Sequence, residues 1–347
     1  MKLAALALLA PLALSAAPAP QDSVFGTRLP LVTGGRALPA RNGAVRFGWP
    51  GVYFEARFKG NSVTVLAVPG DEKLALLIDG QRRHLIQGEK GKEMVVSVTV
   101  PLKPGVHVVR VEKLTESQSG EVRLGGIFSK GGEPLPVPRR PQIEFIGDSH
   151  SVGYGNTSPT RECTQEQVHD TTDTSQAFGP VLAKRLGADY RVIAYSGYGV
   201  VRNYAGKFPG ENLPFLYPRA LPGEPEPAAA DPDWKPATIV INLGTNDFST
   251  PVHAGEAWAD DAALRADYRE KYIAFVRARQ AAQPRARIVL MGAENFYADV
   301  VAVAAATGAT PVKVPRLEMT GCHWHPSLKD HQVMAALLAA TLKKPGR

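Results

Sequence analysis

The sequence of 347 residues has only two cysteines, one long apolar run and no extended cluster of basic residues. The apolar run covers residues 3–14, and no other stretch is long and apolar enough for a membrane-spanning helix. The formal charge of +7 is spread along the chain, so nucleic acid is not an expected partner. Hydrophobic residues make up 44% and charged residues 21%, which excludes a disordered, collagen-like or coiled-coil protein.

Residues 1–19 have the pattern of a secretory signal peptide. Lys2 precedes the apolar run, and small residues from Ser15 to Ala19 follow it, so we predict cleavage near Ala17 or Ala19. The mature protein is then exported, either periplasmic or extracellular, and we expect a monomer. A buried or membrane-anchoring N-terminal helix is the alternative.

The first predicted domain covers residues 24–133. Short segments of alternating polarity recur there at 44–47, 52–58, 62–67, 74–78, 94–100, 106–111 and 122–128. Turn-forming pairs separate several of them, at residues 60–61, 79–80, 104–105 and 119–120. This spacing is typical of an antiparallel β-sandwich. The following stretch, 134–142, contains four prolines and is predicted to be a stiff linker.

The second predicted domain, residues 143–347, alternates strands with helices. Strands are expected at 143–146, 191–195, 238–243, 287–291 and 312–314, and helices at 175–186, 260–282, 298–306 and 327–342. Ser327 and Asp330 are spaced as a capping box for the last helix. The alternation predicts an α/β domain with a parallel sheet between helices. Residues 204–236 contain eight prolines, and this long loop is a candidate wall of a substrate cleft.

Ligands of open parallel sheets bind where loops leave the carboxyl ends of the strands. Ser149 follows the first strand, Gly199 the second and Asn246 the third, while His325 precedes the last helix. A serine becomes a nucleophile when a histidine removes its proton. The backbone N–H groups of Ser149 and Gly199, with the Asn246 amide, could then hold an oxyanion. Gly197 is the alternative to Gly199.

These motifs together resemble those of the SGNH (GDSL-type) hydrolases. They are GDSHSVGYGN at 147–156, SGYG at 196–199 followed by RNY at 202–204, GTNDFS at 244–249 and WHP at 324–326. With the preceding β-sandwich, the chain is similar to family 2 of the carbohydrate esterases. The resemblance implies a flavodoxin-like parallel sheet and a jelly-roll-like sandwich. It also implies removal of acetyl groups from plant polysaccharides, typically 6-O-acetyl on hexose units, through an acetyl-serine, with no metal or cofactor.

The last motif departs from the usual pattern of that superfamily. His323 occupies the position of the acid that orients the catalytic histidine. Either His323 acts as a neutral acceptor, or Ser149 and His325 form a dyad in which a backbone carbonyl holds the other ring nitrogen. Trp324 is a candidate substrate contact through stacking on a sugar ring, and a core position is its alternative.

The two cysteines, Cys163 and Cys322, could form a disulfide in an oxidising compartment or remain free thiols. A disulfide would brace the loop that carries His325. Cys322, His323, His325 and His331 also form a weak ligand pattern, which keeps a metal hydrolase as an alternative. A carbohydrate-binding protein with weak or lost esterase activity is another, since a sandwich domain can bind sugar or simply support its neighbour.

Overall fold

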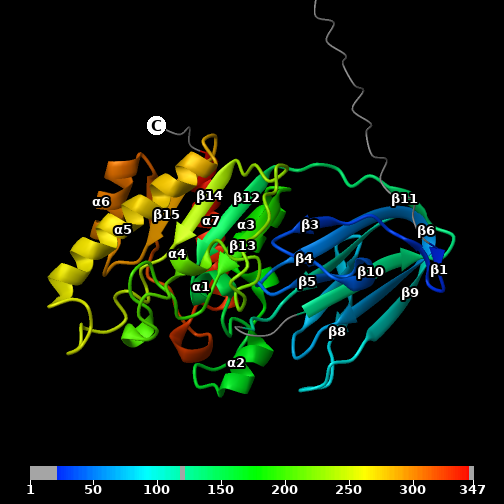
Figure 1. The fold of residues 1–347 in the computed structure, drawn as a ribbon, viewed down its shortest axis with the longest axis horizontal. Coiled ribbons are helices and arrows are strands. Elements are labelled where there is room, and N and C mark those ends of the chain that lie inside the picture. The colour runs from blue at the N-terminus through cyan, green and yellow to red at the C-terminus, as the bar shows by residue number, and fades with distance from the viewer. Residues whose placement is uncertain (1–21, 118–121, 344–347) are drawn as a thin grey trace, which may run out of the picture.

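The computed structural model describes residues 22–117 and 122–343, and it contains two β-sheets that lie side by side (Figure 1). The predicted signal peptide at 1–19 and the predicted turn at Ser119-Gly120 lie outside the described residues. Within that described part, no helix has the length and apolarity needed to cross a membrane.

The first sheet is antiparallel and confirms the predicted β-sandwich class. Its main strand order is β1-β2-β10-β6-β9-β7-β8, with β3 and β11 paired to β6 and β5 paired to β4 and β10. The strands are β1 (Asp22–Ser23), β2 (Gly26–Arg28), β3 (Val32–Gly34), β4 (Leu38–Pro39), β5 (Val45–Phe47), β6 (Tyr53–Val68), β7 (Leu74–Ile78), β8 (Gln81–Ile86), β9 (Val96–Lys113), β10 (Val122–Ser129) and β11 (Glu133–Leu135). A short 3-10 helix, η1 (Arg41–Gly43), lies between β4 and β5.

Two of the predicted turns in this sheet are wrong. Segments 52–58 and 62–67 form one strand, β6, and segments 94–100 and 106–111 belong to one strand, β9. The expected turn residues face each other across this pair, since Gly60 lies opposite Gly105, and the register shifts between Gly60 and Ser62. The irregularity is therefore absorbed as a bulge within a continuous ladder. The Asp79-Gly80 turn is confirmed, because both residues have positive φ between β7 and β8.

The second sheet is parallel, in the order β13-β12-β14-β15-β16. With β12 as its first strand this is the 2-1-3-4-5 order of flavodoxin-like folds, as expected. Helices α5 and α6 lie together on one side of the sheet and α3 and α7 on the other (Figure 1). The strands are β12 (Gln142–Gly147), β13 (Asp189–Ala194), β14 (Thr238–Asn242), β15 (Arg287–Gly292) and β16 (Thr310–Lys313). The helices are α1 (Ser149–Val152), α2 (Gln165–Thr171), η2 (Thr174–Gln176), α3 (Phe178–Arg185), η3 (Tyr204–Gly206), α4 (Leu213–Leu216), α5 (Asp261–Ala282), α6 (Tyr297–Thr307), η4 (Cys322–Trp324) and α7 (Leu328–Lys343).

The predicted helix at 175–186 is divided. Ala177 has an extended backbone, so the short helix η2 ends there and α3 begins at Phe178. The capping box at the last helix is confirmed, because Asp330 accepts the N–H of Ser327 and its own N–H donates to Ser327 Oγ. Asp330 also accepts the N–H groups of Glu318 and Met319, which ties the preceding loop to α7.

The two sheets share a hydrophobic core and a buried polar seam. Apolar residues of both, such as Trp49 and Ile146, belong to one buried cluster. Across the seam, Tyr53 Oη donates to Asp189 Oδ1 at 2.7 Å. Strand β11 includes Pro134 and Leu135, so the stretch predicted as a linker begins inside the first sheet.

Candidate active site

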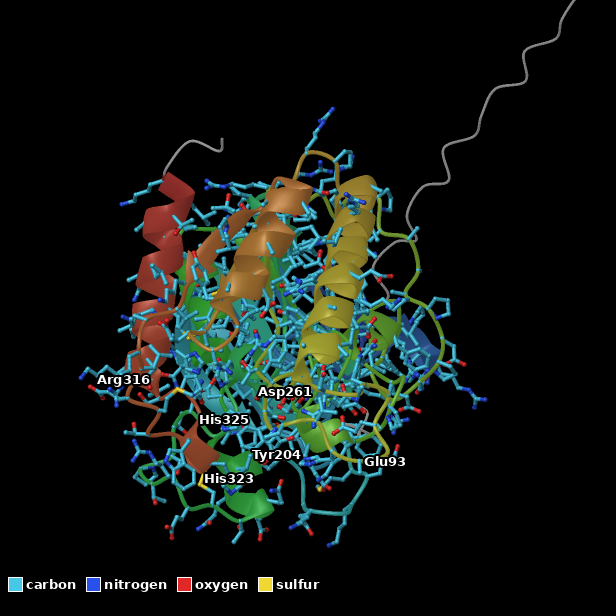
Figure 2. All side chains as sticks on the ribbon, turned by 90° about the vertical axis from the view of Figure 1, so that its left-hand side faces the viewer. Glu93, Tyr204, Asp261, Arg316, His323 and His325 are labelled. Carbon is cyan, nitrogen blue, oxygen red and sulfur yellow. A yellow bond between two sulfur atoms is a disulfide. The ribbon has the colours of Figure 1, made fainter. Side chains whose placement is uncertain are left out.

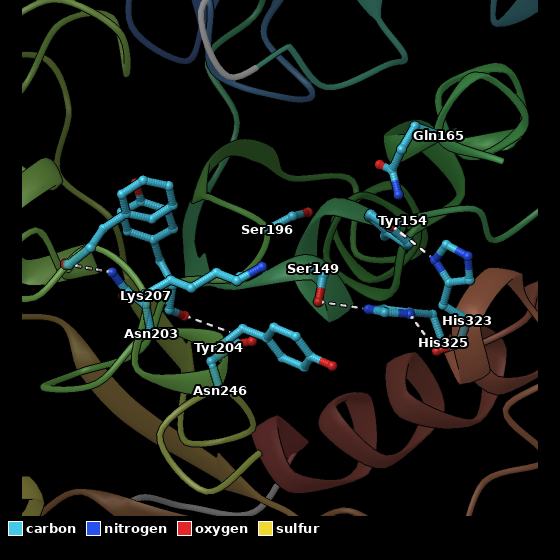
Figure 3. A pocket seen from close by; sticks show the side chains of 13 residues that line it. Ser149, Tyr154, Gln165, Ser196, Asn203, Tyr204, Lys207, Asn246, His323 and His325 are labelled. Carbon is cyan, nitrogen blue, oxygen red and sulfur yellow. Dashed lines mark hydrogen bonds between the residues drawn. The ribbon is translucent and has the colours of Figure 1, made fainter. Parts of the chain in front are cut away.

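A pocket of about 410 Å³ opens at the carboxyl ends of β12, β13 and β14 (Figure 3). Ser149, Asn246 and His325 line it, although they come from segments far apart in the sequence. His323 and Tyr204 lie near His325 on the same side of the molecule (Figure 2). The adjoining loop residues Tyr204, Lys207 and Phe208 also line the pocket, so the start of the proline-rich segment forms a wall of it, as predicted.

Ser149 is fixed at the first position of α1, directly after β12. Asp148 caps this helix by accepting the N–H of His150 at 3.0 Å, and Gly153, with φ of 80°, ends it after one turn. Burial raises the pKa of Asp148 to about 7. Ser149 is itself 5% exposed, and no hydrogen bond to its backbone N–H is found within residues 22–117 and 122–343. Both its hydroxyl and its N–H are therefore available at the strand end.

His325 contacts Ser149 directly. Its Nε2 lies 2.9 Å from Ser149 Oγ, while its Nδ1 lies 2.9 Å from the carbonyl oxygen of Cys322 and 3.1 Å from that of His323. Carbonyl oxygens only accept, so Nδ1 carries the proton and Nε2 is free to accept the serine proton. Burial lowers the pKa of His325 to about 4. The ring is therefore neutral near pH 7.

His323 does not orient His325 through its side chain. The ring of His323 points elsewhere, with Nδ1 3.2 Å from Tyr154 Oη and Nε2 2.8 Å from the carbonyl oxygen of Cys163. The prediction of a ring-to-ring interaction is wrong, whereas the backbone alternative has its geometry in place. A positive φ of 50° at His323 helps to turn its carbonyl group towards His325.

The predicted disulfide between Cys163 and Cys322 is present, with an S–S distance of 2.03 Å, so the free-thiol alternative is wrong. Each half of the bridge also offers its carbonyl oxygen to a histidine, Cys163 to His323 and Cys322 to His325. The bridge thus braces the segment that carries His325. Because its sulfur is bonded, Cys322 is not a thiolate ligand, and within the described residues no cluster of three or more His, Cys, Asp or Glu is placed to hold a metal.

The structure corrects the predicted role of Gly199. Its N–H donates to Asn203 Oδ1 at 3.2 Å, and Gly199 does not line the pocket. Gly197, with φ of 87°, does line it, and its N–H has no hydrogen-bond partner within the described part of the chain. Gly197, the alternative to Gly199, is therefore better placed to donate an N–H to an oxyanion.

Asn246 lies in the pocket as predicted. Its Nδ2 donates to the carbonyl of Tyr198 at 3.0 Å and lies 3.3 Å from Asp148 Oδ2. These two contacts account for both N–H groups of the amide and hold it at the pocket, between the Ser149 loop and the Gly197 loop. The next residue, Asp247, is fully buried and accepts the N–H groups of Val200 and Arg202, which ties the Gly197 loop to the Asn246 loop.

One residue from the segment that follows β9 also contacts this site. Glu116, three residues beyond β9, accepts the N–H of Ser196 through Oε1 at 2.8 Å. Burial raises the pKa of this carboxyl group. Glu116 therefore holds the start of the loop that presents Gly197.

Sequence analysis missed Tyr154 and His150, which enclose the imidazole. The ring centroid of Tyr154 lies 4.3 Å from that of His325, tilted by 33°, and His150 meets His325 edge-on at 5.5 Å. Both lie within the first motif, at positions where the sequence offers no chemical signal of its own.

Trp324 is 61% exposed and is not among the residues that line the pocket. Its core alternative is therefore wrong, and its stacking on a sugar ring stays a prediction.

Two family profiles match the chain. The carbohydrate esterase 2 N-terminal family matches residues 33–138, and the GDSL-like lipase/acylhydrolase family matches residues 145–338. An acetylxylan esterase/glucomannan deacetylase of Cellvibrio japonicus is 42% identical over 332 residues, which cover 91% of each chain. The cellulase/esterase CelE of Acetivibrio thermocellus is 30% identical over 85% of this chain and 37% of its own length.

Solved structures are similar over the same extent. A carbohydrate esterase described as having divergent catalytic and non-catalytic binding functions superimposes with a TM-score of 0.84 at 40% identity, over 92% of this chain and 98% of its own. A family two carbohydrate esterase from Clostridium thermocellum, in complex with cellohexaose, superimposes with a TM-score of 0.77 at 27% identity. The match covers 90% of this chain and 98% of the other. The similarity therefore extends across both sheets.

Proposed function

The chain belongs to family 2 of the carbohydrate esterases, and from this premise we propose that it removes O-acetyl groups from plant-type polysaccharides outside the cytoplasm. The observation that carries the proposal is the 2.9 Å contact between Ser149 Oγ and a neutral His325 in an open pocket. The disulfide is consistent with export, since such bonds persist in oxidising compartments.

The proposed reaction has two steps. Ser149 Oγ attacks the acetyl carbonyl carbon while His325 Nε2 takes the hydroxyl proton, and the tetrahedral intermediate then expels the sugar oxygen, which receives that proton. An acetyl-serine remains. Water attacks it in the second step, again with His325 as base, and acetate leaves as Ser149 regains its proton.

Among the residues that the structure describes, no carboxylate bonds to Nδ1 of His325. Two carbonyl oxygens, of Cys322 and His323, face Nδ1 and supply partial negative charge where the imidazolium forms. They fix the tautomer as an acid would, although a carbonyl dipole stabilises the cation less than a full charge does. We therefore assign Ser149 and His325 as a dyad.

The oxyanion is assigned to three donors: the N–H of Ser149, the N–H of Gly197 and the Nδ2 amide of Asn246, which gives up its longer contact with Asp148 Oδ2 for the oxyanion. Such donors commonly supply the largest electrostatic contribution to acyl transfer, because they are fixed before the charge develops. The backbone donors cannot be removed by substitution, whereas the amide can.

Replacing Asn246 with alanine is expected to lower kcat by about 10²- to 10³-fold, since one oxyanion donor is lost. KM should change little, because the ground-state carbonyl makes weaker use of this amide. Steady-state kinetics on an aryl acetate measure both. An unchanged kcat would remove Asn246 from the oxyanion site.

The pH dependence follows from the pKa of His325, which burial lowers to about 4. Only the neutral imidazole accepts the serine proton, so kcat/KM should rise as the pH increases through about 4 and then level off. At pH 5 the enzyme should keep roughly 90% of its value at pH 7. A midpoint near 6.5, the ordinary value for histidine, would contradict the buried, neutral base.

The substrate class comes from the relatives. The Cellvibrio japonicus relative is an acetylxylan esterase/glucomannan deacetylase, and we propose the same type of substrate for this chain, with 6-O-acetyl hexose as the preferred position. Acetate release from acetylated glucomannan and acetylated xylan, measured side by side, tests this. A 6-O preference predicts faster release from glucomannan, because xylose units have no C6 hydroxyl. No release from either polymer would overturn the proposal.

Carbohydrate binding without turnover is the second candidate. One structural relative is described as having non-catalytic binding functions, and another was solved with cellohexaose. Affinity for an unacetylated polysaccharide, together with the absence of acetate release, would favour this reading.

A further inference from the structure

A second cavity, of about 830 Å³, lies at the junction of the two sheets, away from Ser149. Its polar wall includes Glu144 and Arg191, near the amino ends of β12 and β13, whereas the catalytic pocket is at the carboxyl ends. The first sheet contributes Arg36, from the turn between β3 and β4, and α5 contributes Arg279 from its last turns. The volume is within the usual range of ligand sites.

The cavity has an excess of positive charge. Its lining includes three arginines, Arg36, Arg191 and Arg279. Only two carboxylates, Glu144 and Asp231, line it as well. Glu144 is already used by neutral donors, because its two oxygens accept from Tyr217 Oη at 2.8 Å and Trp234 Nε1 at 3.3 Å. Asp231 pairs with Arg191.

Two of the three arginines retain unused donors, whereas Arg36 already donates through Nη1 to the carbonyl oxygens of Tyr217 and Arg219. Nε of Arg191 and Nε of Arg279 are buried without an acceptor among the described residues. The rest of the Arg279 guanidinium has no hydrogen bond or ion pair within residues 22–117 and 122–343 either, and it only contacts aromatic rings. A buried N–H without an acceptor is costly, so the cavity favours a ligand that accepts.

The electrostatics of the cavity favour a negatively charged ligand. Burial lowers the pKa of Arg36, and the charges of Arg191 and Arg279 lower it further, although Tyr217 and Glu144 oppose them. Like charges held this close repel one another. An anion placed among them would relieve that repulsion.

A neutral sugar fits this cavity poorly. The rings that would stack on it are already covered: the Arg191 guanidinium lies 4.0 Å from the centre of the Trp234 ring, and Arg36 and Arg279 lie 4.6 and 4.0 Å from that of Tyr217. Recognition must therefore come from charge. Planar guanidinium groups match the two oxygens of a carboxylate.

We propose that Arg36, Arg191 and Arg279 form a binding site for the carboxylate of a uronic acid unit. The choice of a carboxylate over a phosphate or sulfate rests on the proposed polysaccharide substrate, since uronic acids are the common acidic units of plant polymers. Bound there, an acidic side branch would tether the polymer to the enzyme while acetyl groups react at the other end of the sheet.

The test is isothermal titration calorimetry of the full protein with sodium glucuronate, glucose, sodium acetate and sodium sulfate at constant ionic strength. We expect one glucuronate to bind per protein and glucose to give no binding heat. Acetate and sulfate should each bind with an affinity at least tenfold lower than that of glucuronate. Equal binding of acetate would assign the site to any small carboxylate and overturn the uronic acid. Tighter binding of sulfate would overturn the carboxylate, and no binding of glucuronate would overturn the site.

Arg279→Gln should weaken glucuronate binding at least tenfold and leave acetate release unchanged, because Arg279 is remote from Ser149. Arg277→Gln is the matched control, since Arg277 lies on the same helix but does not line the cavity. Equal affinity in the two variants would overturn the proposal. Calorimetry needs no turnover, so loss of binding is distinguishable from failure of the esterase assignment.

Discussion

Replacing Ser149 with alanine is expected to lower kcat for acetate release by about 10⁴- to 10⁶-fold, the range seen when a serine hydrolase loses its nucleophile. Ser149 Oγ is the hydroxyl that lies 2.9 Å from His325 Nε2, so the variant loses the group whose proton the imidazole is proposed to take. The assay is acetate release from acetylated glucomannan. Affinity for the polymer should stay the same, because the hydroxyl contributes mainly to the transition state.

Ser151→Ala is the matched control. Ser151 lies two residues later in α1, and its Oγ is buried without a hydrogen-bond partner among the described residues. Removing it should leave kcat within about twofold and should not lower stability, since no hydrogen bond is lost. More than 1% residual activity in Ser149→Ala, after checks for contaminating wild-type enzyme, would show that another group is the nucleophile.

Removing the disulfide is expected to have the largest effect on stability. The bridge joins residues separated by 159 positions, and a loop of that length corresponds to about 5 kcal/mol of unfolding free energy in the chain-entropy account. The double variant Cys163→Ala/Cys322→Ala should lose about that amount in urea denaturation. Its kcat should also fall, because the bridge holds in place the two segments whose carbonyl oxygens contact His323 and His325.

Reductant provides the internal control for this prediction. Dithiothreitol should destabilise the wild-type protein towards the level of the double variant and should leave the variant itself unaffected. A variant that keeps both its unfolding free energy within about 1 kcal/mol and its kcat would mean that the surrounding packing alone holds the His325 segment.

Much of the α/β half was predictable because its signals are local. The apolar run at 238–243 and the capping residues Ser327 and Asp330 lie inside the elements that they define, and the motifs at strand ends converge by the general rule for parallel sheets. The first sheet was less predictable. Gly60 and Gly105 are typical turn residues, and only their pairing across two long strands shows that they form a bulge.

The details of the site depend on contacts that a sequence does not encode locally. Gly197 and Gly199 are two residues apart, and the side chain of Asn203 decides which N–H remains free. His323 occupies the position of an acid, but its backbone carbonyl rather than its ring faces His325. Tyr154 and His150 enclose the imidazole of His325 because of the way α1 and the loop after it fold.

The contact of Glu116 with Ser196 limits how the gene segments that encode the two sheets can be recombined. The loop that begins at Ser196 is held by the Glu116 carboxylate, so recombination that separates the two residues would remove this support. Gene shuffling should therefore transfer the two sheets as a single cassette. The match to CelE fits this expectation, since 85% of the present chain corresponds to only 37% of that longer protein. Glycan-degrading enzymes built by fusion would acquire this catalyst whole, with its sandwich attached.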